Sequence, residues 1–286
     1  MFKVWPIVQK RSFKTVPLAF AKYSADEQIK SNKPLIICHG LFGSKQNWRS
    51  LARSLSQSCQ RDVYAIDARN HGESPHAHEH HYEAISHDIL EFIQHHQLHQ
   101  PILLGHSMGG KAMMYVALQQ PELVSKLIVV DIAPVHSPLT REYHDHIRIM
   151  REIQSRRLTR QKEADDILKT VEPDVAVRQF LLTNLKKNKS DGVYQFRVPL
   201  TILENALGHL GEFRPKLKKK GVYQGPTLFI TGDQSPFRKP FLRMPSLVPS
   251  YFPNATVVTV KEAGHWVQAE KPDEFLSLTT EFILQH

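Results

Sequence analysis

Short apolar, β-branched segments alternate with helix-length amphipathic segments along most of this chain. A strand that is buried on both faces shows a continuous apolar run, and strands that alternate with helices pair in parallel. The pattern therefore predicts an α/β fold with a mostly parallel central sheet flanked by helices. The predicted strands cover residues 33–40, 62–67, 101–106, 126–134, 226–232 and 255–260, and the predicted helices cover 47–57, 82–96, 111–120 and 272–284.

The alternation stops between residues 137 and about 215, where no buried strand is predicted. Ligands of open α/β sheets bind beyond the carboxyl ends of the strands, so we expect a site under this insertion. We predict a helical lid over 137–215, inserted into a core made of residues 15–136 and 216–286. The helical patterns within the lid cover residues 141–154, 160–171, 174–187 and 199–210.

The charge of the chain does not indicate a nucleic-acid partner. The formal net charge is +9, but residues 1–25 contribute five basic side chains and no acid. The rest of the chain has 32 basic and 28 acidic residues, which is a modest excess. No apolar run approaches the ~18 residues of a membrane-spanning helix, so no integral membrane segment is expected. The two cysteines do not form a disulfide framework, which leaves a reducing compartment open.

The start of the chain is basic, free of acids and dotted with large apolar residues. This composition is typical of a mitochondrial targeting segment, which we place at residues 1–14. A basic disordered tail on a cytoplasmic protein is the alternative.

A G-x-S-x-G pattern follows the strand predicted at 101–106. Residues 105–111 read GHSMGGK and lead into the helix predicted at 111–120; in this context the pattern places a nucleophilic serine on a sharp turn. The turn forces the serine towards positive φ, so the residues two positions away must be small, as Gly105 and Gly109 are. It also places the hydroxyl beside the positive N-terminus of the helix. Ser107 is therefore the predicted nucleophile.

A serine hydroxyl is a weak nucleophile unless a base takes its proton. The chain has 17 histidines, so a lone histidine means little. His265 stands out because it lies in a loop of small residues before the C-terminal helix. It also comes last in the order serine, acid, histidine that accompanies this serine motif. We therefore expect His265 to be the base.

Acyl transfer also needs backbone N–H groups that stabilise the developing oxyanion. Met108 directly follows the serine and is expected to supply one. The loop HGLFGS, residues 39–44, ends an early strand and is the expected source of the other. Leu41 is the first choice within it and Phe42 is the competing one.

Two aspartates are candidates for the acid that orients His265. Asp131 ends the apolar segment KLIVVD, 24 residues after Ser107, and Asp233 lies in ITGDQSPF. Adjacent parallel strands lie about 4.8 Å apart, so either carboxylate can in principle reach one imidazole. Asp233 comes two residues before the usual acid position in that loop, a displacement of about 6 to 7 Å. We predict Asp131, and we read Asp233 as a turn residue.

The chain resembles the α/β-hydrolase superfamily and, within it, the family of the mitochondrial alpha/beta hydrolase domain-containing protein eleven. Small bacterial esterases and yeast ethanol acetyltransferases are similar. The resemblance runs from about residue 15 to the C-terminus and implies a serine-dependent ester or thioester hydrolase of mitochondria. The segments that carry it are CHGLFGSKQNW, DARNHGESPH, GHSMGGKAMMYVALQQPELV, VVDIAPV, AVRQFLLTNL, GPTLFITG and AGHWV.

The resemblance also bears on the acid. It implies that the acid comes from the earlier strand, as Asp131, and that Ser235, at the usual acid position, is an auxiliary hydrogen-bonding group near His265. Asp233 departs from the family, in which a small residue is more usual.

Two polar segments are read as parts of the scaffold. HAHEHH, residues 76–81, follows a turn and has no matched carboxylates or cysteines, so we expect a solvated loop and no metal site. The segment DARNHGESP contains Asp67, Arg69 and His71, which we expect to support the site without taking part in the reaction.

These residues together predict a serine hydrolase that forms an acyl-enzyme from a small ester or thioester, with no metal or organic cofactor. If an alcohol outcompetes water at the acyl-enzyme, the same residues would make an alcohol acyltransferase with acetyl-CoA as donor. A non-catalytic partner-binding protein on a hydrolase scaffold is the alternative of another class.

Overall fold

A computed structural model describes residues 14–24, 31–215 and 221–285 of the chain. The expected targeting segment, residues 1–14, lies outside the described residues except for its last position, so the mitochondrial location stays a prediction. Within the described ranges, no helix is long and apolar enough to cross a membrane.

The core is a seven-stranded sheet with the order β1-β3-β2-β4-β5-β8-β9. Only β1 pairs antiparallel, with β3, and the other pairs are parallel. This confirms the predicted fold class. The strands are β1 (Phe20–Tyr23), β2 (Ser31–Cys38), β3 (Arg61–Ile66), β4 (Ile102–His106), β5 (Lys126–Val130), β8 (Thr227–Gly232) and β9 (Ala255–Val260).

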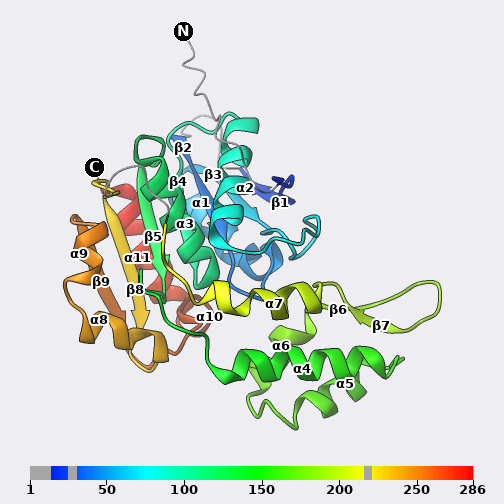
Figure 1. Ribbon diagram of the computed structural model, residues 1–286. Helices are drawn as coiled ribbons and strands as arrows, with labels where there is room; N and C mark the ends of the chain where they lie inside the picture. Colours follow the sequence, from blue (N-terminus) through cyan, green and yellow to red (C-terminus); the bar gives the residue numbers. More distant parts are fainter. Residues whose placement is uncertain (1–13, 25–30, 216–220, 286) are drawn as a thin grey trace.

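Helices cover both faces of the sheet because its central strands are apolar on both faces (Figure 1). Alternate residues of β2 show the division: Leu35 and Ile37 pack with one apolar cluster, and Ile36 and Cys38 pack with the other. The first cluster includes side chains of α1 (Arg49–Ser58) and α11 (Pro272–Leu284). The second includes side chains of α2 (Tyr82–His95) and α3 (Met108–Gln119).

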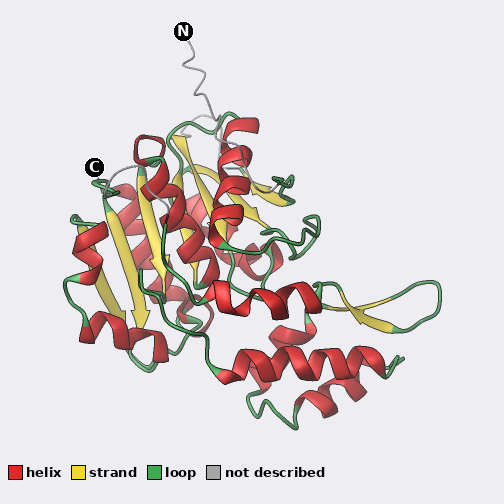
Figure 2. Ribbon diagram, viewed as in Figure 1, coloured by secondary structure: helices red, strands yellow, loops and turns green. Residues whose placement is uncertain are grey.

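The segment between β5 and β8 carries most of the chain outside these layers. It contains α4 (Arg141–Ser155), α5 (Gln161–Leu168), α6 (Val175–Leu182) and α7 (Leu200–Leu210). In Figure 2 these helices lie on the side towards which the arrows of the parallel strands point. They therefore lie beyond the carboxyl ends of the strands, where ligands of such sheets bind.

The prediction of helices alone in this insertion is wrong at its centre. β6 (Leu185–Lys187) and β7 (Tyr194–Phe196) form a two-stranded antiparallel hairpin, whereas the sequence pattern extends a helix to residue 187. The reason is the turn: Gly192 has φ +72°, and its N–H donates to the Asn188 carbonyl. An Asp-Gly pair is a hairpin signal that outweighs helical periodicity over so few residues.

Two further elements were not resolved by the sequence pattern. β1 is a four-residue edge strand, too short to show a period. Between β8 and β9 the chain forms two short helices, α8 (Lys239–Arg243) and α9 (Leu247–Tyr251), preceded by a 3-10 turn at Pro236–Arg238.

Candidate active site

Ser107 lies on a strained turn between β4 and α3. Its backbone has φ +52° and ψ −116°, and its N–H donates to the Val130 carbonyl at 2.9 Å. A non-glycine residue with positive φ is uncommon and costs free energy, so the surrounding packing must hold it there. The turn directs the Ser107 side chain into a pocket, at the N-terminus of α3.

The glycines on either side of the serine allow this turn. A Cβ atom on Gly105 would lie 2.4 Å from the Gly109 carbonyl oxygen, and one on Gly109 would lie 2.4 Å from the Cys38 carbonyl oxygen. Both distances are far shorter than a van der Waals contact with backbone. The start of α3 therefore packs so closely on β4, at Gly105, and on the end of β2, at Gly109, that no side chain fits at either glycine.

We expect Gly109→Ala to lower the free energy of unfolding by about 3 kcal/mol, because the methyl group would overlap backbone atoms that cannot move independently. Gly208→Ala is the matched control: Gly208 lies in α7 and a Cβ there would meet nothing within 4 Å. That variant should be neutral or more stable by up to about 1 kcal/mol. Urea titrations followed by circular dichroism would compare the two, and equal stability would contradict the packing argument.

Asp131 and His265 meet where β5 and β9 end. The Nδ1 atom of His265 lies 2.7 Å from Oδ2 of Asp131, and this carboxylate is fully buried. Because a carboxylate oxygen only accepts, the geometry assigns the proton to Nδ1 and leaves Nε2 as the acceptor. Asp131 itself has φ +51°, the second strained residue of the site.

Three further groups hold the Asp131 carboxylate. Thr231 Oγ1 donates to Oδ1 at 2.9 Å, and the Gly232 N–H donates to the same atom at 3.1 Å. Ser235 Oγ donates to Oδ2, the oxygen that also accepts from His265. Ser235 therefore reaches the acid, whereas the sequence analysis placed it near the histidine only in general terms. Both oxygens are fixed by neighbours, which fixes the orientation of the imidazole.

Asp233, the alternative acid, does not approach His265. Its side chain is exposed, and its backbone N–H donates to the Val260 carbonyl at 3.0 Å. Its place in the chain just after β8 corresponds to a turn, as the sequence reading suggested.

Aromatic rings hold the His265 ring in place. The ring centroid of Phe237 lies 4.3 Å from that of His265, and the ring centroid of His106 lies 4.7 Å from it. His106 Nε2 donates to the His265 carbonyl at 2.9 Å. Burial lowers the pKa of His106 to about 3, so this ring stays neutral and acts as a fixed donor. Since His106 precedes Ser107, this bond ties the histidine loop to the serine turn.

The loop after β2 is held from two sides. Phe42 has φ +62°; its N–H donates to His71 Nε2 at 3.1 Å, and its carbonyl accepts from Asn184 Nδ2 at 2.7 Å. His71 belongs to the core and Asn184 to the insertion, and both are buried. Burial lowers the pKa of His71 well below its usual value, which keeps Nε2 free to accept. The Phe42 N–H is therefore already bonded to His71 and is not available to a ligand. Leu41, the residue before it, lines the pocket.

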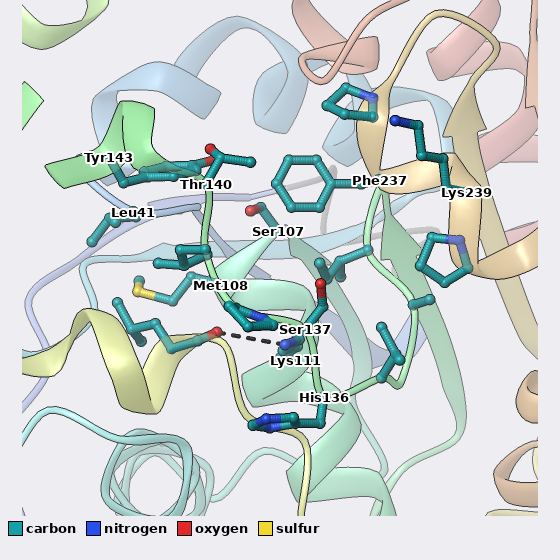
Figure 3. Close-up of a pocket in the computed structure, with 18 of the residues that line it drawn as sticks. Leu41, Ser107, Met108, Lys111, His136, Ser137, Thr140, Tyr143, Phe237 and Lys239 are labelled. Atoms are coloured by element: carbon teal, nitrogen blue, oxygen red, sulfur yellow. Dashed lines mark hydrogen bonds between the residues drawn. The ribbon is translucent and has the colours of Figure 1, made fainter. Parts of the chain in front are cut away.

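A pocket of about 310 Å³ contains Ser107 (Figure 3). Ser107 and Met108 come from the α3 turn, Leu41 from the loop after β2, and Tyr143 from α4 of the insertion. Figure 3 shows Phe237 beside the Ser107 hydroxyl. The lining is mainly apolar and includes Leu41, Met108, Ile132, Ala133, Val135, Leu139, Tyr143, Leu210 and Phe237.

A family model described as the alpha/beta hydrolase fold matches residues 33–272, which is most of the chain. The chain belongs to the α/β-hydrolase family.

Two curated relatives and one solved structure narrow the position within the α/β-hydrolase family. The chain is 36% identical to the sn-1-specific diacylglycerol lipase ABHD11 of Mus musculus, over 96% of this chain and 88% of that one. It is 37% identical to a probable alcohol acetyltransferase of Saccharomyces cerevisiae, over 91% and 80%. The structure of a marine microorganism esterase superposes with a TM-score of 0.84 at 34% identity, covering 94% of this chain and all of that one. The family predicted from the sequence motifs is confirmed.

The residues expected to support the α/β-hydrolase site lie behind it. Asp67 accepts from the backbone N–H of Lys45 at 2.6 Å, and Arg69 binds Asp88 through Nε at 2.6 Å. All of these side chains are buried. Neither Asp67 nor Arg69 lines the pocket, whereas His71 contacts the site through Phe42.

The histidine-rich segment 76–81 contributes to no group of three or more possible metal ligands among the described residues. His80 is buried against Asn70, and His81 Nδ1 accepts the Ala84 N–H at the start of α2. A different group in the insertion could bind an ion: the ligand atoms of Glu142, His146 and Glu172 lie within 4.8 Å of one another. His146 and Glu172 already form a hydrogen bond of 2.8 Å there.

Sequence reasoning missed Thr231, His106, Phe237 and Asn184. Thr231 had a usable signal, because a threonine just before the final glycine of the apolar strand TLFITG needs a buried partner. Asn184 had none, because its partner lies 142 residues away along the chain.

Proposed function

We propose that this α/β-hydrolase cleaves carboxylic esters or thioesters through a triad of Ser107, His265 and Asp131. The observation that carries the proposal is the 2.7 Å contact of His265 Nδ1 with the buried Asp131, in a loop whose His265 carbonyl accepts from His106, the residue directly before the strained Ser107. A carboxylate in this position fixes the tautomer that leaves Nε2 able to take a proton, and it stabilises the imidazolium that forms.

The reaction proceeds in two halves. Ser107 Oγ attacks the acyl carbonyl carbon while His265 Nε2 takes the hydroxyl proton. The tetrahedral intermediate collapses, the bond to the leaving alcohol or thiol breaks, and His265 returns the proton to the leaving group. Water then attacks the acyl-enzyme, giving its proton to His265, and the carboxylic acid leaves as Ser107 regains its proton.

The oxyanion of each intermediate is stabilised by two backbone N–H groups, from Met108 and Leu41. Met108 is the first residue of α3, where N–H groups lack intrahelical partners and the helix dipole is positive. Leu41 is favoured over Phe42 because the Phe42 N–H already donates to His71. Thr231 and Ser235 act as positioning residues through Asp131.

The pocket volume favours small acyl groups. Its 310 Å³ lies at the lower end of the range of about 300–1,000 Å³ for ligand pockets. Hydrolysis of p-nitrophenyl esters across chain lengths should therefore be fastest for short acyl chains.

A labelled fluorophosphonate tests the proposal directly. It should inactivate the folded wild-type protein and leave one adduct, on the peptide that contains Ser107, as measured by mass spectrometry. A short p-nitrophenyl ester should protect against labelling in proportion to its occupancy. Unmodified Ser107 in folded protein, with no ester turned over, would favour the non-catalytic binding role.

The yeast relative supports alcohol acyl transfer as a second candidate function. The same acyl-enzyme would form, and an alcohol in place of water would release an ester. The ratio of ester to free acid formed with ethanol present separates the two.

A further inference from the structure

The pocket beside Ser107 carries charge of one sign. Its lysine and arginine lining residues are Lys111, Lys239 and Arg243. No aspartate or glutamate is among the described residues that line it. In a partly enclosed cavity, unpaired charge of one sign attracts ligands of the other sign.

Lys111 is already engaged and does not account for this asymmetry. Its Nζ donates to the carbonyl oxygens of Gly211 at 3.0 Å and Glu212 at 3.2 Å, just beyond the C-terminus of α7 (Figure 3 shows the weaker contact with Leu210). Burial lowers the pKa of Lys111 to about 8. Lys111 therefore attaches the end of α7 to the core and has no donor left for a ligand.

Lys239 and Arg243 differ from Lys111 because both side chains are exposed. Neither forms a side-chain hydrogen bond or ion pair with any described residue. They are the first and last residues of α8, four positions apart, so they lie near each other on one face. Both can therefore contact a ligand at the pocket without breaking an existing interaction.

The local sequence leaves these cations uncompensated. No aspartate or glutamate occurs between Asp233 and Glu262, and Arg238 adds a third cation next to Lys239. Like charges four residues apart destabilise a helix, and a lysine at the N-terminus of a helix opposes its dipole. An arrangement that costs stability and lines a cavity is expected where a ligand supplies the missing charge.

We propose that the substrate of this hydrolase carries an anionic group, a carboxylate or a phosphate, that lies against Lys239 and Arg243 while its acyl carbonyl meets Ser107. This inference rests on the proposed function. In Figure 3 Lys239 lies on the far side of Phe237 from Ser107, so the anion lies away from the serine. The apolar lining near Met108 and Leu41 then holds the uncharged part of the substrate.

Two matched substrate pairs test this. The first compares 4-nitrophenyl hexanoate with the mono-4-nitrophenyl ester of adipic acid, which differ in a terminal carboxylate on the acyl group. The second compares S-acetylpantetheine with S-acetyl-4′-phosphopantetheine, which share the thioester and differ in one phosphate on the leaving group. The anionic member of at least one pair should have the higher kcat/KM, and the pair that responds locates the anion on the acyl or the leaving side.

The variant Lys239→Gln/Arg243→Gln should lower kcat/KM for the preferred anionic substrate by about 10-fold, since each exposed ion pair contributes up to about fivefold. The loss should appear mainly in KM, and the neutral substrates should change by less than about twofold. Lys162→Gln/Lys169→Gln is the control for net charge, because it removes the same two charges from exposed residues that do not line the pocket. Added salt should weaken the preference in the wild type and not in the double variant.

The proposal is overturned if the wild type does not prefer the anionic member of either pair, or if the double variant keeps the wild-type preference. It is also overturned if the double variant loses activity only on vesicles of anionic lipid, because α8 would then contact a membrane surface through the exposed Leu242. Calorimetric binding of free coenzyme A and of adipate to the wild type and double variant requires no turnover. It separates failure of the anion site from failure of the proposed hydrolysis, which would abolish turnover of every substrate.

Discussion

Ser107→Ala is expected to lower kcat for ester hydrolysis by about 10⁴- to 10⁶-fold, the largest effect of any single change in this chain. The substitution removes the only atom that forms the covalent bond with the acyl group in the proposed reaction. It leaves the pocket and the backbone N–H groups of Met108 and Leu41 in place, so KM should change little. Initial rates on a short p-nitrophenyl ester, with active protein quantified by fluorophosphonate titration of the wild type, give this ratio.

The alanine variant should remain folded, because the Ser107 side chain forms no hydrogen bond that supports the turn. Far-UV circular dichroism and the urea midpoint would establish this. Ser190→Ala, an exposed serine of the hairpin turn in the insertion, is the control and should retain wild-type activity. A folded Ser107→Ala protein with wild-type turnover would remove the serine mechanism from consideration.

Asp131→Asn is expected to lower kcat by about 10⁴-fold. An amide at this position can present its NH₂ group to His265, which would favour the tautomer with the proton on Nε2 and leave the base unable to accept from Ser107. The side chain keeps its size and can still accept from Thr231 and Gly232, so the fold should be retained. Initial rates on a short p-nitrophenyl ester give this ratio, and far-UV circular dichroism with the urea midpoint separates loss of the base from loss of the fold.

Asp233→Asn is the matched control for this change. The Asp233 side chain is exposed and lies in the turn directly after β8, so its replacement should leave kcat within about twofold. If Asp233→Asn were inactive and Asp131→Asn active, Asp131 would not be the acid that orients His265 in the reaction.

Much of this architecture is readable from local pattern. Continuous apolar runs predicted the six parallel strands. Gly105 and Gly109 predicted the serine turn, because a tight connection from strand to helix requires small residues two positions before and after the serine. Asp131 was predicted because it comes directly at the end of a predicted strand. Adjacent parallel strands end at the same edge of the sheet, so a carboxylate there can reach a histidine that follows another strand. The hairpin at residues 185–196 was missed because three-residue strands show no period, and the competing helical pattern before it was longer.

The parts of the site that sequence reasoning missed depend on contacts between distant segments. Thr231 binds Asp131 across 100 residues, and Asn184 binds Phe42 across 142. Nothing local to Asn184 distinguishes it from an ordinary polar residue after a helix. Likewise, Lys239 and Arg243 line the pocket without an ion pair to any described residue, and this depends on how α8 packs in the folded chain.

The hydrogen bond from Asn184 to the Phe42 carbonyl has a consequence for protein engineering. Insertions of this kind are natural units to exchange between homologous enzymes when a new specificity is wanted. Here the exchanged unit would carry half of the support for the loop that contains Leu41, because the core supplies His71 and the insertion supplies Asn184. A chimaera whose donor lacks an amide at the position of Asn184 would leave a buried carbonyl without its partner, at a cost of about 1–3 kcal/mol. Successful recombination therefore requires the donor to be chosen for this residue as well as for its pocket.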